Sequence, residues 1–156
     1  MALKLSTIAD GTLEVISRID SAISPKMDAD KFNEYLRTLD ESVLEFVEGE
    51  KPTRFVLRKV LPWGLAQKVQ NKQAKLEKGE VQFQLGYQNE EVRCALIGIK
   101  NPDTLAEDEH IKYERGSDGG ASEELMSKLI AAGIANDLWI ARSNATAKTK
   151  TDLKKT

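Results

Sequence analysis

The single histidine of the chain stands beside a run of carboxylates, which is an arrangement that could do chemistry. His110 directly follows Glu107, Asp108 and Glu109. Such a cluster could hold a metal ion, or it could raise the pKa of the imidazole. The spacing differs from the Asp-x-Asp-x-Asp-Gly pattern of a calcium loop. We therefore favour a solvated loop histidine over a metal ligand.

The single cysteine, Cys94, lies in the apolar stretch Val92-Arg-Cys-Ala-Leu96. A nucleophilic thiol needs a base and a group that orients the base, and His110 is the only imidazole in the chain. We expect Cys94 to behave as a small buried hydrophobic residue. A lone cysteine also excludes a disulfide framework and a cysteine-based zinc site.

Two adjacent glycines, Gly119 and Gly120, precede a predicted helix and could cradle an anion on free N–H groups. The segment lacks the lysine of a phosphate-binding loop, and Glu123 and Glu124 would repel a phosphate. A turn is the better interpretation. We assign no catalytic, cofactor-binding or metal-ligating residue and expect no cofactor, so the sequence predicts a protein that is not an enzyme.

The remaining residues of functional interest are candidates for contacts with other proteins. Trp63 and Trp139 stand at a break and on an amphipathic segment; each could be a half-buried core anchor or an interface anchor. Two arginines share one face of a predicted strand, and four lysines lie near the C-terminus. The candidate interface residues are Arg54, Arg58, Trp63, Trp139, Lys148, Lys150, Lys154 and Lys155.

These residues must be positioned by a chain of 156 residues, the size of one ordinary domain. We predict a single α+β domain over residues 1–143 and a basic flexible tail over 144–156. Apolar residues make up 40% and charged residues 31%, which indicates a folded core under a highly charged surface. No apolar run is long enough to span a membrane, and the N-terminus lacks the apolar region of a signal peptide. We expect a soluble cytosolic protein.

Charge alternates along the chain in four blocks. Residues 1–48, 49–100, 101–141 and 142–156 carry −5, +5, −6 and +4, for a net charge of −2. The blocks are either solvated faces of one fold or complementary surfaces of neighbouring copies. The sequence pI of about 5.6 disfavours nucleic acid as a partner.

The N-terminal 42 residues are predicted to form an acidic helical hairpin. Apolar residues recur at helical spacing over 12–23, and the Ser24-Pro25 pair would end this helix. A second helix opens at Asp28 or Asp30. Its apolar stripe consists of Phe32, Tyr35, Leu36 and Leu39.

A β-hairpin should follow, with strands near 43–47 and 53–60 separated by Gly49 and Pro52. In the second strand, Phe55 and Leu57 point to one face, while Arg54 and Arg58 point to the other. The basic face is therefore available to a partner, and the apolar face belongs to the core.

The C-terminal half should be mostly helical. A polar helix over 63–78 ends at Gly79, and 80–99 fits either a helix or a strand, of which we prefer the helix. A short strand is expected at 111–115, and Ser122 should cap a helix that Gly133 interrupts. A last helix covers 134–143. The fold class is α+β, with several helices packed on a small antiparallel hairpin or sheet.

The order of these elements resembles that of small accessory proteins encoded in the tail gene clusters of tailed bacteriophages. The resemblance covers 43–142 and rests on the motifs Lys51-Pro-Thr-Arg-Phe-Val-Leu-Arg-Lys-Val-Leu61, Ala95-Leu-Ile-Gly-Ile-Lys-Asn101 and Ser122-Glu-Glu-Leu-Met126. Tail assembly chaperones and minor tail or neck components belong to this group. The group is non-enzymatic, so the resemblance implies no functional residue.

The resemblance implies a bacteriophage tail or neck protein that acts in virion assembly through protein–protein contacts. Its partners would be other tail or neck proteins and copies of itself, with no membrane, while the charge of the chain disfavours nucleic acid. It would work in the host cytoplasm during assembly or remain in the virion. The alternative is a small acidic cytosolic inhibitor or regulatory binding module, whose acidic segments would mimic phosphates.

Overall fold

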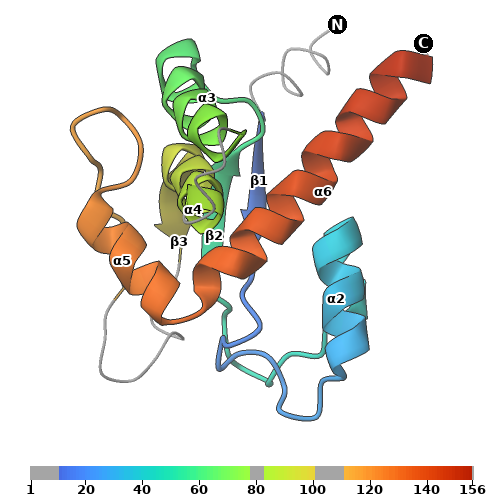
Figure 1. Cartoon of the computed structure of the whole chain (residues 1–156). Coiled ribbons are helices and arrows are strands. Elements are labelled where there is room, and N and C mark those ends of the chain that lie inside the picture. Colours follow the sequence, from blue (N-terminus) through green and yellow to red (C-terminus); the bar gives the residue numbers. More distant parts are fainter. Residues whose placement is uncertain (1–10, 78–82, 101–110, 156) are drawn as a thin grey trace, which may run out of the picture.

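The computed structural model describes residues 11–77, 83–100 and 111–155. Within these ranges, the backbone alone is described for 72–77, 83–85 and 147–155. In that part of the chain, five α-helices accompany one antiparallel three-stranded sheet with strand order β1-β2-β3, which confirms the predicted α+β class. The helices gather on one face of the sheet (Figure 1). His110 and Gly79 lie outside the described residues, and so does the start of the predicted N-terminal segment.

The central strand β2, Arg54–Arg58, follows the predicted alternation of faces. Phe55 and Leu57 are fully buried, while the arginines on either side of them are half-buried. Its partners, however, differ from the predicted hairpin. β2 pairs with β1, Thr12–Val15, on one side and with β3, Leu96–Lys100, on the other.

The predicted helix over 12–23 is wrong, and the N-terminal helical hairpin with it. Leu13 and Val15 instead face Leu57 and Phe55 across the β1–β2 ladder. The chain then turns at Ser17, whose hydroxyl donates to the Asp137 carboxylate, 3.2 Å away. These contacts join residues that are far apart in sequence. They override the local spacing of apolar residues, which fits a strand as well as a helix.

The predicted strand over 43–47 is also wrong. Asp40 caps a short 3₁₀ turn, η1 (Glu41–Val43), by accepting hydrogen bonds from the amide and hydroxyl of Ser42. This local bonding competes with a strand. In place of a strand, the structure has an isolated bridge, in which Phe46 pairs with Ile23.

The helix predicted to begin at Asp28 or Asp30 is confirmed as α2, Ala29–Thr38, with Asp28 as its N-cap. Its buried residues are Phe32, Tyr35 and Leu36. The Tyr35 hydroxyl accepts a hydrogen bond from the Ile16 amide at 2.9 Å, and burial raises the pKa of Tyr35 to about 12. α2 is therefore fastened to the chain just after β1.

The segment 80–99 contains both a helix and a strand. α3, Trp63–Glu77, agrees with the predicted polar helix, and α4, Phe83–Ala95, packs against it. β3 then begins at Leu96 with no intervening loop. The strand predicted at 111–115 is reduced to one bridge between Arg115 and Ala121.

Two helices complete the fold. α5, Glu123–Ala131, starts at the predicted cap, where the Ser122 hydroxyl accepts from the Leu125 amide. Gly133, at φ +78°, separates it from α6 (Ile134–Lys155). The segment 144–156, predicted as a basic flexible tail, continues α6 up to Lys155, because it extends a helix that is already nucleated. Its flexibility in solution stays a prediction.

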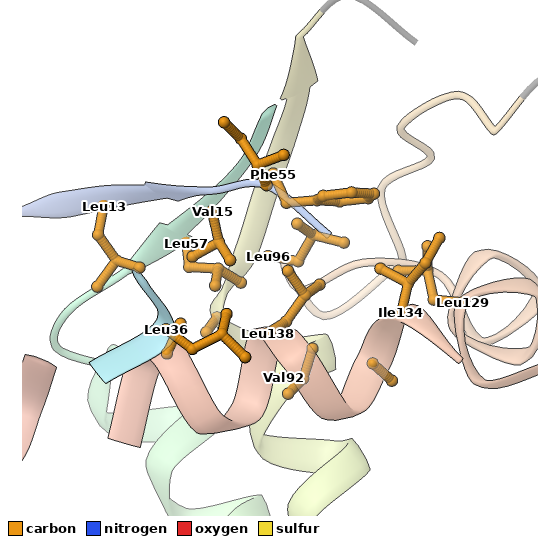
Figure 2. Close-up of a cluster of buried hydrophobic side chains, with 14 of the residues drawn as sticks. Leu13, Val15, Leu36, Phe55, Leu57, Val92, Leu96, Leu129, Ile134 and Leu138 are labelled. Atoms are coloured by element: carbon orange, nitrogen blue, oxygen red, sulfur yellow. The ribbon is translucent and has the colours of Figure 1, made fainter. Parts of the chain in front are cut away.

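The core lies between the sheet and the helices. Figure 2 shows Phe55, Leu57 and Leu96 directed from the strands toward Leu138 and Ile134 of α6. All five are fully buried. The sheet therefore has a covered face, which stabilises the fold, and the ends of β2 emerge at opposite edges of this core.

Candidate interaction surface

The most exposed large apolar side chains of the described residues lie just beyond the end of β2. Trp63 is 80% exposed and Val60 is 81% exposed. We call residues 59–63 the tip. Tryptophan is enriched at the energetic centres of protein interfaces, so an exposed tryptophan is a candidate for a protein contact. Because Trp63 is exposed to this extent, the structure excludes the interpretation of Trp63 as a half-buried core anchor.

The tip is held in place by the core helix α6. The buried Arg142 side chain donates from Nε to the carbonyl of Arg58 at 2.8 Å and from Nη2 to the carbonyl of Lys59 at 3.1 Å. After the tip, the Ala66 amide donates to the Pro62 carbonyl at 2.9 Å, which starts α3. Trp63 is thus presented on a braced turn between a strand and a helix.

Basic side chains surround the tip. Arg58, Lys68 and Arg115 line an open hollow of about 420 Å³ beside Pro62, with Asp118 as the acidic residue in its lining. Lys59 is exposed in the tip itself. The apolar tip therefore stands in a positively charged setting, which favours an acidic partner.

The two arginines predicted to form a basic face make contacts within the chain. Arg54 forms an ion pair with Glu41 at 2.7 Å, and this bond raises the pKa of the arginine. Arg58 donates from Nη1 to the Cys94 carbonyl at 3.1 Å. Arg54 is thereby neutralised within the fold, whereas Arg58 also borders the hollow beside the tip.

Trp139 and the basic C-terminal residues stand differently. Trp139 packs against the core, and its Nε1 donates to Glu91 at 3.3 Å, as a half-buried anchor would. The four candidate lysines lie in the last turns of α6, where the structure describes the backbone alone. Figure 1 shows this end of α6 extending past the other helices. These lysines are Lys148, Lys150, Lys154 and Lys155.

A second exposed apolar pair lies at the opposite end of β2. Phe46 is 39% exposed and Val47 is 37% exposed. They belong to residues 44–50, which we call the acidic loop, because Glu45, Glu48 and Glu50 are all exposed. The sequence analysis assigned this pair to a strand and so did not predict its exposure. The pattern that indicates an exposed position is the placement of the two apolar residues among three glutamates.

A charged cluster near the tip was also missed. Arg93 donates to Glu90 and, from Nη2, to Asp118 at 2.7 Å, and Lys68 pairs with the same Asp118 at 2.7 Å. The bond from Arg93 holds the pKa of Asp118 well below its usual range. The charges compensate one another, so the cluster fixes the loop around Asp118 to α4. No motif connects these residues in the sequence.

The described residues that the sequence singled out for chemistry have structural roles: Cys94 lies in the core, and the two glycines form a turn. Cys94 is fully buried, and burial raises the pKa of its thiol to about 12. Gly119 and Gly120 form the predicted turn; Gly119 has φ +95°. Among the described residues, no group of three or more histidines, cysteines and carboxylates is arranged to hold a metal ion.

Comparison with known proteins yields no relative: the chain matches no family model, no curated protein and no solved structure. Within the described ranges, none of the helices has the length and apolar character needed to cross a membrane. We therefore infer the function from the surface of the chain itself.

Proposed function

We propose that this chain is a non-enzymatic tail or neck protein of a tailed bacteriophage, which acts in virion assembly through protein–protein contacts. The single observation that carries the proposal is the braced, exposed Trp63 at the tip. Tryptophan is enriched at the energetic centres of interfaces, and an indole exposed to this extent stabilises no core. The phage setting is supported by the resemblance over 43–142.

The state of the ionisable groups supports a binding role. Arg93, Glu90, Asp118 and Lys68 are engaged with one another, and the cluster fastens a loop. The Cys94 thiol is buried and protonated at neutral pH, so it is a poor nucleophile. These groups serve the fold, whereas the tip projects from it.

The test compares phage that carry the wild-type gene with phage that carry Trp63→Ser. We expect the yield of infectious particles to fall at least tenfold, with incomplete particles in the lysate. Ile130→Ser is the matched control, because Ile130 is a 46% exposed apolar residue on α5, away from the tip. An unchanged yield for Trp63→Ser, or for deletion of the gene, would overturn the proposal.

Mass spectrometry of purified particles then distinguishes two versions of the role. A structural component is present in a fixed copy number, which reflects the symmetry of the particle. A chaperone acts in the host cytoplasm during assembly and is missing from the finished particle. Stoichiometric retention of one host protein on the purified chain would instead favour the inhibitor.

A further inference from the structure

We infer that the tip of one copy binds the acidic loop of a second copy, so that the chain associates head to tail. This inference rests on the proposed function, because it names a copy of the chain as one of the partners. It starts from the distribution of exposed apolar residues. Of the six large ones in the described part of the chain, Val60 and Trp63 lie in the tip, and Phe46 and Val47 lie in the acidic loop.

The two surfaces are complementary in charge. The acidic loop places Glu45, Glu48 and Glu50 around its apolar pair, and Lys51 follows at its end. The tip carries the opposite charge, with Asp118 already paired to Lys68 and Arg93. Since Lys68 and Arg93 are balanced by Asp118 and Glu90, the positive charge of the tip and its hollow comes from Arg58, Lys59 and Arg115.

The geometry places these surfaces where one molecule cannot join them. The acidic loop precedes β2 and the tip follows it, so the strand separates them by about 16 Å, at about 3.3 Å per residue over the five residues of β2. Figure 1 shows β2 running from the loops at the bottom of the view to the start of α3 at the top. A contact between them therefore requires two copies.

Both surfaces are fixed to the fold before they meet. The tip is held by Arg142, as described above. The acidic loop is joined to the N-terminal turn, because the Val47 amide donates to Ala22 at 2.8 Å and the Ser24 amide donates to Glu45 at 2.8 Å. Preformed surfaces lose little conformational entropy on binding.

Because the contact joins two different surfaces, it is heterologous. Such contacts generate a ring if the rotation closes and a filament if it does not. Two loops bury less area than a standard interface, so we expect a dissociation constant of about 0.1 mM for the isolated chain. In an assembling particle, neighbouring partners would raise the effective concentration of copies.

The experiment uses the purified full chain in sedimentation equilibrium, with one variant for each surface. Trp63→Ser disables the tip, and Glu48→Lys combined with Glu50→Lys disables the acidic loop. Since all three side chains are exposed, the variants should fold, which thermal unfolding checks. Each variant alone should associate at least tenfold more weakly than the wild type, and Ile130→Ser should match the wild type.

Mixing the two variants separates this inference from other modes of association. The tip variant keeps its acidic loop and the loop variant keeps its tip, so one intact contact can form between them. We expect a 1:1 heterodimer that grows no further. Loss of association in the tip variant alone would mean that the tip binds some other surface, which would overturn the inference.

A wild-type chain that remains monomeric at about 1 mM would overturn it as well, because that limit corresponds to a very weak contact. This outcome is distinguishable from failure of the proposed function. A monomeric chain whose Trp63→Ser variant still lowers phage yield would use its tip on a different tail or neck protein. Association in solution without any effect on phage would leave the contact intact and remove the phage role.

Discussion

At the scale of single residues, the two tryptophans show how burial separates structural from interacting side chains. Trp139 packs on the core and donates to Glu91, whereas Trp63 is 80% exposed on a turn. Both occupy amphipathic or boundary positions in the sequence, so their types and spacing could not distinguish them. The distinction depends on where each side chain lies on its helix: Trp139 is on the side of α6 that packs against the core, whereas Trp63 is exposed at the start of α3.

Phe55 gives the clearest prediction about the core. The side chain is fully buried between the sheet and the helices (Figure 2), so Phe55→Ala removes a large volume from a packed site. We expect a loss of about 3–5 kcal/mol in the free energy of unfolding, measured with denaturant. Arg54→Ala is the control on the opposite face.

The Arg54 control loses an ion pair in which Arg54 and Glu41 are 26% and 41% exposed. Solvent screening limits its contribution, so the expected cost is at most about 1 kcal/mol. A neutral Phe55→Ala together with an unfolded Arg54→Ala would show that the strand presents its faces the other way round.

At the scale of elements, the sequence predicted those whose local pattern was unambiguous. β2 alternates apolar and basic residues, and α5 has both a cap and an apolar stripe, so both were predicted correctly. β1 was missed because its apolar residues fit a helical spacing as well as a strand. Its pairing with β2, about 40 residues away in sequence, decided the outcome.

The charged cluster around Arg93 could not be predicted for a related reason. Arg93 and Asp118 are 25 residues apart and belong to no motif, so only the packing of α4 against the following loop brings them together. Likewise, Arg142 reaches the carbonyls of Arg58 and Lys59 across more than 80 residues. Such contacts are products of the tertiary fold and have no local signature.

The docking of this loop on α4 predicts that Gly120 tolerates no side chain. A Cβ atom there would lie 3.0 Å from the Arg93 carbonyl oxygen and 3.1 Å from the Cys94 Cα, so the backbone would have to move. We expect Gly120→Ala to lower the free energy of unfolding by about 1–3 kcal/mol.

The matched control is Gly86→Ala in α4. Nothing lies within 4 Å of a Cβ at this position, and alanine is the better helix former. This variant should therefore gain about 0.5–1 kcal/mol in the same denaturant experiment. Equal losses at both glycines would contradict the close packing of the loop on α4.

The same cluster predicts a pH dependence of stability. The native pKa of Asp118 lies below its unfolded value of about 3.9, so its stabilising contribution is complete above about pH 5 and declines as the pH falls. Asp118→Asn should cost about 1–3 kcal/mol at pH 7. The difference between variant and wild type should shrink steadily below about pH 4.

Lys68→Gln provides the comparison for this pH series. Lys68 is half-exposed and removing it leaves Asp118 bound to Arg93, so we expect a loss of at most about 1 kcal/mol. A difference between Asp118→Asn and wild type that stays constant from pH 7 to pH 3 would contradict a role for the ionised carboxylate.

At the scale of the whole molecule, parts of the alternating charge blocks lie at separate places on the surface. The net charge of −2 conceals a basic tip at one end of β2 and an acidic loop at the other. The sequence left open whether the blocks are solvated faces or surfaces for neighbouring copies. The proposed contact between copies would use both ends of β2, because their charges are opposite and each end exposes two apolar side chains.

This arrangement predicts that self-association weakens as salt is added. Raising the ionic strength from about 0.05 M to 0.5 M shortens the screening length to a few ångströms, which attenuates attraction between exposed charges. We expect the association constant from sedimentation equilibrium to fall at least tenfold over this range. A variant with Glu48→Gln and Glu50→Gln should associate more weakly at low salt and respond less to salt. Association that is constant or stronger at high salt would instead assign the contact to the apolar side chains of Trp63 and Val60, since burial of apolar surface is strengthened by excluded salts.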